Sequence, residues 1–236
     1  PPPPPPPPLF FFTHNPPPPI LSGLVGSEMC IRDSVNIALA NEFAMHAEEL
    51  GIDIGPVIEA SNSQPFSHIH YPGIAVGGHC IPVYPKFYLS TDIEASLPSS
   101  SILVNESMPK RAVHSLYGSE DNALDGKKIA ILGAAYRNGV KETAFSGVFP
   151  LVEEVTNLGG VAVVHDPLYT NDELAELGLI GFQLGEQCDA AIVQTDHTIY
   201  AELSSVSYTH LRAHETREDR GWRRRGGKKN GGGGGG

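Results

Sequence analysis

Lys127-Lys128-Ile129-Ala130-Ile131-Leu132-Gly133 is a short apolar run that ends in glycine, and it predicts a buried β-strand. A helical pattern over 146–158 follows it, and further strand-like runs stand at 161–167 and 190–194. Strands that alternate with helices predict a parallel α/β sheet, which binds ligands at the carboxyl ends of its strands. The expected fold class is therefore α/β.

The turn after the first strand limits what this sheet can bind. Gly133-Ala134-Ala135-Tyr136 lacks the second and third glycines of a dinucleotide-binding turn, so we do not expect NAD here. Asp166, at the end of the second strand, has two open interpretations. It is either an acid for a ribose hydroxyl or part of a strand-ending Asp-Pro turn.

The chain before the sheet is predicted to be helical. Residues 35–50 have the three- and four-residue apolar spacing of an amphipathic helix, and Asp53 or the residues just after it start a second, short helix. A further helix is expected over 99–117, broken or kinked by Pro109. The polar connector 118–126 is the expected domain boundary.

A glycine-rich loop between these helices presents one thiol: Tyr71-Pro72-Gly73-Ile74-Ala75-Val76-Gly77-Gly78-His79-Cys80-Ile81-Pro82-Val83. Its glycines allow close backbone approach, and its prolines exclude a continuous helix. Cys80 is either a buried structural cysteine or a nucleophile, which would need a nearby positive charge or a helix N-terminus. His79 is adjacent but is not an obvious partner.

Both ends of the chain differ from the middle in composition. Residues 1–34 begin with eight prolines, and residues 207–236 are rich in Arg and Lys and end in six glycines. Residues 26–34 and 207–216 resemble peptides translated from sequencing-adapter DNA. We therefore expect both ends to be disordered and artefact-like, and we give little weight to a nucleic-acid arm or a Pro-rich ligand there.

The remaining residues, 35–206, hold 7 basic and 22 acidic residues, a net charge of −15. This charge argues against nucleic acid as a partner. Two cysteines without a disulfide framework indicate a reducing, cytoplasmic location, and no apolar run is long enough to span a membrane. His68 and His70 lack a third ligand at suitable spacing, so no metal site is expected.

Several of these stretches together resemble the nucleotide-sugar 6-dehydrogenase family, the family of UDP-glucose 6-dehydrogenase. The resemblance rests on 77–83, on 35–44, on 105–109 and on the strand–Gly–Ala-Tyr-Arg turn that ends at Arg137. It covers about 35–206. It implies a central helix that builds a homodimer through 35–50, an active-site-cysteine domain over 35–124, and a truncated, Rossmann-like UDP-binding domain over 125–206.

The resemblance also implies roles for particular residues. Cys80 would be catalytic, and Val83 would contact the cofactor. Substrate contacts would come from Ile69, His70, Tyr71, Pro72, Gly73, Gly77, Gly78, Tyr136 and Arg137. The sequence departs from the family pattern in three places: residues 24–34 lack the family's catalytic Lys and Asn, Tyr84 stands where many members have Asp, and Ala144 stands where an Arg is expected.

The implied activity is NAD-dependent oxidation of the C6 alcohol of a UDP-N-acetylhexosamine to a uronate, through a thiohemiacetal and a thioester on Cys80. UDP-glucose is the alternative substrate. We expect the chain to be a C-terminal fragment that lacks the main NAD-binding domain and is inactive alone. The other interpretations are a non-catalytic UDP-sugar-binding or dimerisation module, and a chimeric reading frame without a cellular role.

Overall fold

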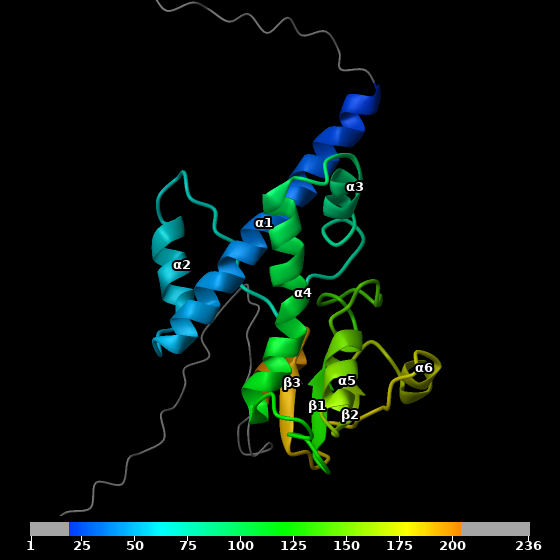
Figure 1. Cartoon of the computed structure of the whole chain (residues 1–236). Helices are drawn as coiled ribbons and strands as arrows, with labels where there is room; N and C mark the ends of the chain where they lie inside the picture. The colour runs from blue at the N-terminus through cyan, green and yellow to red at the C-terminus, as the bar shows by residue number, and fades with distance from the viewer. Residues whose placement is uncertain (1–18, 204–236) are drawn as a thin grey trace, which may run out of the picture.

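The computed structural model describes residues 19–203, in a helical half followed by a half built on a sheet (Figure 1). The helical half holds α1 (Pro19–Glu49), α2 (Ile54–Asn62), α3 (Tyr84–Thr91) and α4 (Ser96–Tyr117). The second half holds β1 (Lys128–Leu132), α5 (Val148–Asn157), β2 (Val161–His165), α6 (Asn171–Glu176), β3 (Ala190–Val193) and the 3-10 helix η1 (Thr198–Glu202).

The predicted parallel sheet is confirmed. β1 is the central strand and pairs in parallel with β2 on one side and with β3 on the other, so the strand order is β2-β1-β3. The carboxyl ends of all three strands therefore meet at one edge. The turn after β1 lies between the ends of its two neighbours, where ligands of such sheets bind.

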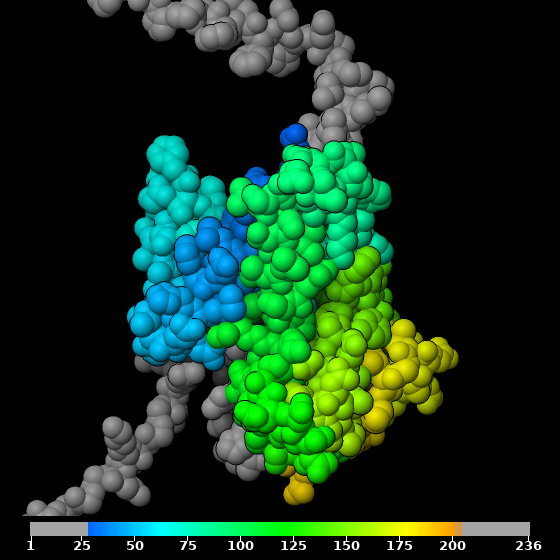
Figure 2. All heavy atoms as spheres, viewed as in Figure 1, coloured from blue at the N-terminus to red at the C-terminus, as the bar shows by residue number. Residues whose placement is uncertain are grey.

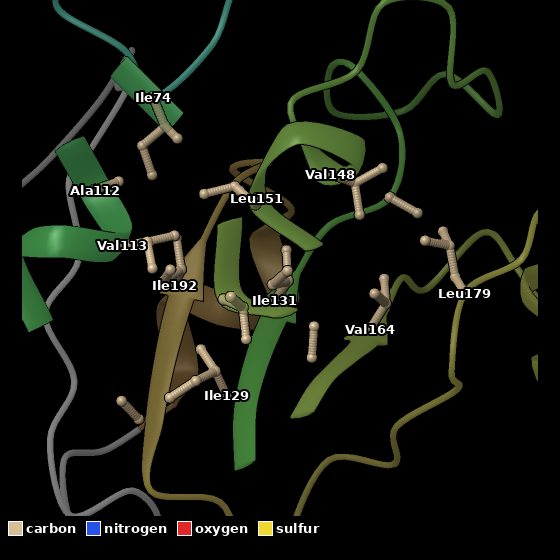
Figure 3. Close-up of a cluster of buried hydrophobic side chains, with 14 of the residues drawn as sticks. Ile74, Ala112, Val113, Ile129, Ile131, Val148, Leu151, Val164, Leu179 and Ile192 are labelled. Atoms are coloured by element: carbon tan, nitrogen blue, oxygen red, sulfur yellow. The ribbon is translucent and has the colours of Figure 1, made fainter. Parts of the chain in front are cut away.

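The core lies on both faces of this sheet because side chains alternate along β1. On one face, Ile131 belongs to a buried cluster with Val113 of α4 and Leu151 of α5 (Figure 3). On the other face, Leu132 belongs to a second cluster with Phe182. Helix α4 thus covers one face of the sheet.

Helix α4 also packs along α1, and it therefore ties the two halves together. Figure 2 shows its surface between that of α1 and that of the sheet half. Polar side chains bond within the buried α1–α4 contact: Ser34 shares a hydrogen bond with Ser101 at 3.0 Å, and the amide of Asn41 donates to Asn105 at 3.0 Å. Buried polar bonds of this kind favour one register of the two helices.

The expectation that residues 19–34 are disordered is wrong, because they form the first half of α1. The predicted helix start at residue 35 is an interior position of that helix, and Ser34 is buried against α4. No proline interrupts the chain between Pro19 and Pro56, and proline is tolerated in the first turn of a helix. The expectations for residues 1–18 and 204–236 lie outside the described residues.

The break expected at Pro109 is also absent, since α4 runs without interruption from Ser96 to Tyr117. Pro109 is buried, as are Met108 and Ala112 beside it. Burial of both flanks against the rest of the protein offsets the one backbone hydrogen bond that proline cannot donate. The second short helix begins as predicted, with Asp53 capping α2 by accepting from the Gly55 amide at 2.9 Å.

Candidate active site

Cys80 lies in a tight turn directly before α3. Its carbonyl accepts the amides of Val83 at 3.2 Å and Tyr84 at 2.9 Å, and Tyr84 is the first residue of that helix. Cys80 and His79 are exposed, whereas Gly78 beside them is buried. The interpretation of Cys80 as a buried structural cysteine is therefore wrong, because the backbone of the loop is packed while its thiol is accessible.

The cysteine loop packs against the sheet half at its glycines. The Gly78 amide donates to the carbonyl of Ala144 at 2.8 Å. A Cβ on Gly77 would lie 2.5 Å from the Cβ of Tyr136, and one on Gly78 would lie 3.1 Å from its ring. The loop can approach Tyr136 this closely only because both positions are glycine. The structure thus brings together the predicted residues Gly77, Gly78 and Tyr136 beside Cys80.

A side-chain hydrogen bond adds a second link across the same junction. The Nε2 of His79 lies 2.5 Å from Oε1 of Glu142, and the carbonyl of Glu142 accepts the Tyr136 amide at 2.9 Å. His79 therefore faces Glu142 in the sheet half. This contact joins residues 63 positions apart in the sequence, and no local pattern predicts it.

The turn after β1 is held by both neighbouring strands. Asp166, at the end of β2, accepts the amides of Ala134 at 2.7 Å and Ala135 at 2.8 Å. Thr195, just after β3, donates its hydroxyl to the carbonyl of Ala135 at 2.5 Å. Gly133 has φ +108°, and a Cβ there would lie 2.4 Å from Thr195. Only glycine fits that position.

These contacts resolve the two interpretations of Asp166 in favour of the turn. The carboxylate also accepts the Leu168 amide at 2.8 Å, and the residue is 2% exposed, so no ribose hydroxyl can reach it. Burial raises its pKa, but hydrogen bonds from His197 and from the amides of Ala135 and Leu168 outweigh burial and hold the pKa below its ordinary value.

The same geometry argues against NAD at this sheet. The amides that would cradle a pyrophosphate at a dinucleotide turn already bond to the Asp166 carboxylate. The described sheet does not fit a dinucleotide, in agreement with its missing glycines.

The predicted substrate loop, residues 69–73, lies along α1. Asn36 accepts the His70 amide at 3.0 Å, and Asn41 accepts the Gly73 amide at 2.8 Å. The Gly73 amide is therefore already bonded and is not free for a phosphate. Pro72 is buried beside it, whereas Ile69 and His70 are half-buried and Tyr71 is exposed. Sequence reasoning missed Asn36 and Asn41, whose role becomes visible only when the loop is seen against the helix.

The remaining predicted residues lie at the edges of the site. Arg137 is exposed, and its guanidinium carbon lies 5.8 Å from the centre of the Tyr136 ring. Val83 is the half-buried N-cap of α3. These predicted substrate residues form two groups among the described residues: the 69–73 loop bonds to α1, whereas Arg137 belongs to the turn after β1 and lies against Tyr136.

Sequence reasoning also missed Cys30, because residues 1–34 were set aside. Cys30 lies on α1 within hydrogen-bond reach of Cys80. Its pKa is raised by burial first, and then by the charge of Cys80 and its hydrogen bond with that side chain. Cys30, in the first half of α1, therefore lies beside the thiol of Cys80. The absence of proline between Pro19 and Pro56 was the signal that could have revealed this.

Two other features of the described residues bear on the site. Between residues 19 and 203 there is no group of three or more His, Cys, Asp or Glu side chains placed to hold a metal ion. None of the helices in that range is long and apolar enough to cross a membrane.

Comparison with known proteins agrees with this arrangement. Residues 28–107 match the model of the UDP-glucose/GDP-mannose dehydrogenase family, central domain. UDP-N-acetyl-D-mannosamine dehydrogenase of Pyrococcus horikoshii is 36% identical over 187 residues, which cover 77% of this chain and 42% of that protein. The protein of the same name from Methanocaldococcus jannaschii is 34% identical over 166 residues, covering 70% and 38%.

Solved structures give the same result. The UDP-N-acetyl-mannosamine dehydrogenase of P. horikoshii aligns with a TM-score of 0.65 at 29% identity, covering 82% of this chain and 47% of that one. A UDP-glucose dehydrogenase from Pyrobaculum islandicum aligns with a TM-score of 0.69 at 26% identity, covering 78% and 45%. The chain spans less than half the length of these relatives. It belongs to the UDP-glucose/GDP-mannose dehydrogenase family, and residues 28–107 are its match to that family's central domain.

Proposed function

We propose that this chain carries the thiol and part of the UDP-sugar site of an NAD-dependent 6-dehydrogenase, which oxidises the C6 alcohol of a UDP-N-acetylhexosamine to a uronate. The observation that carries the proposal is the exposed thiol of Cys80, held where the α1 helix, the glycine loop and the β1 turn meet. The relatives named UDP-N-acetyl-D-mannosamine dehydrogenase favour an N-acetylhexosamine over glucose.

The chemistry assigned to Cys80 is covalent capture of an aldehyde. When C6 of the sugar is an aldehyde, the Sγ atom attacks the carbonyl carbon, a C–S bond forms, and the carbonyl oxygen takes up the proton that the thiol loses. Capture holds the aldehyde in the site as a thiohemiacetal. Oxidation of that adduct gives a thioester, and water cleaves it to the uronate and the free thiol.

NAD is the hydride acceptor that the proposed reaction requires. The described sheet does not fit it, and we assign it no contact here beyond the expectation for Val83. The UDP group is assigned to Tyr136 and Arg137, because an arginine fork suits phosphate and because the turn lies at the carboxyl edge of the sheet.

A homodimer through α1 and a cytoplasmic location remain part of the proposal. Leu39 and Phe43 of α1 are more than 40% exposed, which supports the dimer, and the described cysteines are all free thiols, which suits a reducing compartment.

The proposal is tested by protection of Cys80 from alkylation. The chain is incubated with iodoacetamide, and peptide mass spectrometry follows labelling of Cys80 and, as an internal control, of Cys188. A UDP-N-acetylhexosamine that carries an aldehyde at C6 should slow labelling of Cys80 by about tenfold or more at saturation, because the thiol is consumed. Labelling of Cys188 should not change.

The unoxidised UDP-N-acetylhexosamine and its glucose counterpart are the matched ligands. The alcohol should protect Cys80 less than the aldehyde does, since it can only cover the thiol. The proposal is abandoned if neither aldehyde nor alcohol slows labelling of Cys80. Equal protection by both would favour a non-catalytic UDP-sugar-binding module. The absence of lysine from residues 24–34 supports that alternative.

A further inference from the structure

Asp166 and His197 form a buried pair at the carboxyl edge of the sheet, and the proposed chemistry at Cys80 uses neither of them directly. The Asp166 side chain is fully buried and that of His197 is 4% exposed, and the Nε2 of His197 lies 3.2 Å from Oδ2 of Asp166. The other ring nitrogen, Nδ1, lies 3.1 Å from Oδ1 of Asn138. A titratable pair this deep is costly to bury, and it persists only where the fold satisfies it.

The hydrogen bonds of Asp166 and His197 go mainly to the turn after β1, residues 134–138. Asp166 accepts the amides of Ala134 and Ala135 at the start of the turn after β1, and His197 contacts Asn138 at its end. The third amide on Asp166 comes from Leu168, two residues along its own chain. The pair therefore holds the 134–138 turn at both ends, and Tyr136 lies midway between them.

Tyr136 carries this constraint to the cysteine loop. Its Cβ occupies the space that a Cβ on Gly77 would need, and its ring lies against Gly78. Gly78 in turn donates its amide to Ala144, in the segment that follows the turn. Cys80 stands two residues further along. A displaced turn would move Tyr136 away from the glycines and leave the loop without its packing partner.

We propose that Asp166 and His197 are positioning residues for Cys80: they fix the 134–138 turn, and the turn fixes the Gly77–Gly78 backbone through Tyr136. This inference rests on the proposed function for its meaning in the reaction, because only a reacting thiol requires such placement. The link between the Asp166–His197 pair and the cysteine loop consists of hydrogen bonds and of the packing of Tyr136 against Gly77 and Gly78, so it can be measured without any substrate.

The test is amide hydrogen exchange of Gly78 in the whole chain, with the amides of β1 as the reference for global opening. Asp166→Asn keeps the size of the side chain. It replaces a carboxylate, which only accepts hydrogen bonds, with an amide whose NH2 group can point at the backbone N–H groups of Ala134 and Ala135 and fail to bond to them. Exchange of Gly78 should rise by about tenfold relative to β1, because its bond to Ala144 opens more often. The rate at which Cys80 is alkylated should rise together with the exchange rate of the Gly78 amide.

Asp189→Asn is the matched control, since Asp189 accepts the Lys128 amide at 2.8 Å at the opposite end of β1. It removes the same kind of bond from the same strand, and exchange of Gly78 relative to β1 should stay at the wild-type value. If Asp166→Asn does not fold, His197→Ala takes its place, because it leaves the amide bonds of Asp166 intact. A rise of about threefold is then expected.

The inference is overturned if Gly78 and β1 exchange change by the same factor in the Asp166 or His197 variant, or if the Asp189 variant alters Gly78 equally. The proposed function is read separately, from protection of wild-type Cys80 by the UDP-sugar aldehyde. A wild-type chain that fails that assay can still pass the exchange test, so the two failures are distinguishable.

Discussion

Replacement of Gly77 by alanine is the sharpest test of how the two halves meet at Cys80. The new Cβ would lie 2.5 Å from the Cβ of Tyr136 and 3.2 Å from the backbone carbonyl oxygen of Phe145. Gly77 does not have a positive φ, so alanine meets a steric obstacle there and no backbone strain. The methyl group can be accommodated only if the loop and Tyr136 move apart by about 1 Å.

The magnitude follows from the cost of overpacking. An extra methyl group in a well-packed contact destabilises a protein by about 1–3 kcal/mol. For a domain of this size, that corresponds to a fall of about 2–12 °C in the unfolding midpoint. The separation should also open the Gly78–Ala144 bond, because Gly78 moves with its neighbour.

The assay combines a thermal melt with exchange of the Gly78 amide. Gly51→Ala is the control, since Gly51 has φ +69° and nothing within 4 Å of a Cβ placed there. Its cost is about 1 kcal/mol from backbone conformation alone, and exchange of Gly78 should not respond. A Gly77→Ala chain with the wild-type midpoint and wild-type Gly78 exchange would refute the packing described between the loop and Tyr136.

The other predictions concern buried and partly buried polar groups. Asn41→Ala leaves the Gly73 amide unpaired and should cost about 2 kcal/mol in urea unfolding, with proteolysis near residue 70 as a local readout; an unchanged cleavage rate would contradict the role of Asn41. Because the pKa of Asp166 is lowered in the fold, its ionisation contributes stability at neutral pH that is lost as pH falls through the folded-state pKa, below the ordinary value of about 4. The free-energy difference between wild type and Asp166→Asn should therefore shrink between pH 7 and pH 3, and a constant difference would count against it. Glu154→Gln weakens the hydrogen bond between Glu154 and His114, whose Nε2 lies 2.5 Å away, and should cost about 1 kcal/mol; a melt equal to that of wild type would show that this bond contributes no stability.

The sheet could be predicted because its signal is local. The run 127–133 is short, mostly apolar and ended by glycine, and short apolar runs return at 161–167 and 190–194. Such runs have few alternatives to a buried strand, and the intervening helix makes the strands parallel. All three strands appear where the pattern places them. The family resemblance was equally local, since it rests on four short stretches of contiguous residues, one of which is the 77–83 loop that holds Cys80.

Helix boundaries were harder to predict because tertiary packing overrides local preference. Pro109 breaks an isolated helix, yet α4 continues through it with both flanks buried. Residues 19–34 were set aside for their composition, yet they extend α1 and bring Cys30 to Cys80. Neither outcome can be read from a window of neighbouring residues, because each depends on what the helix packs against.

The sequence by itself determined the parallel α/β sheet, the glycine loop with its single thiol, and the absence of a dinucleotide turn after β1, because each is set by residues adjacent in the chain. Only the tertiary structure decided that Asp166 faces inward to the turn, that Asn41 holds the Gly73 amide, and that Tyr136 fills the space beside Gly77. These contacts join residues 31 or more positions apart. Their geometry is fixed by burial and by hydrogen-bond satisfaction in the folded chain, and no periodicity in the sequence encodes them.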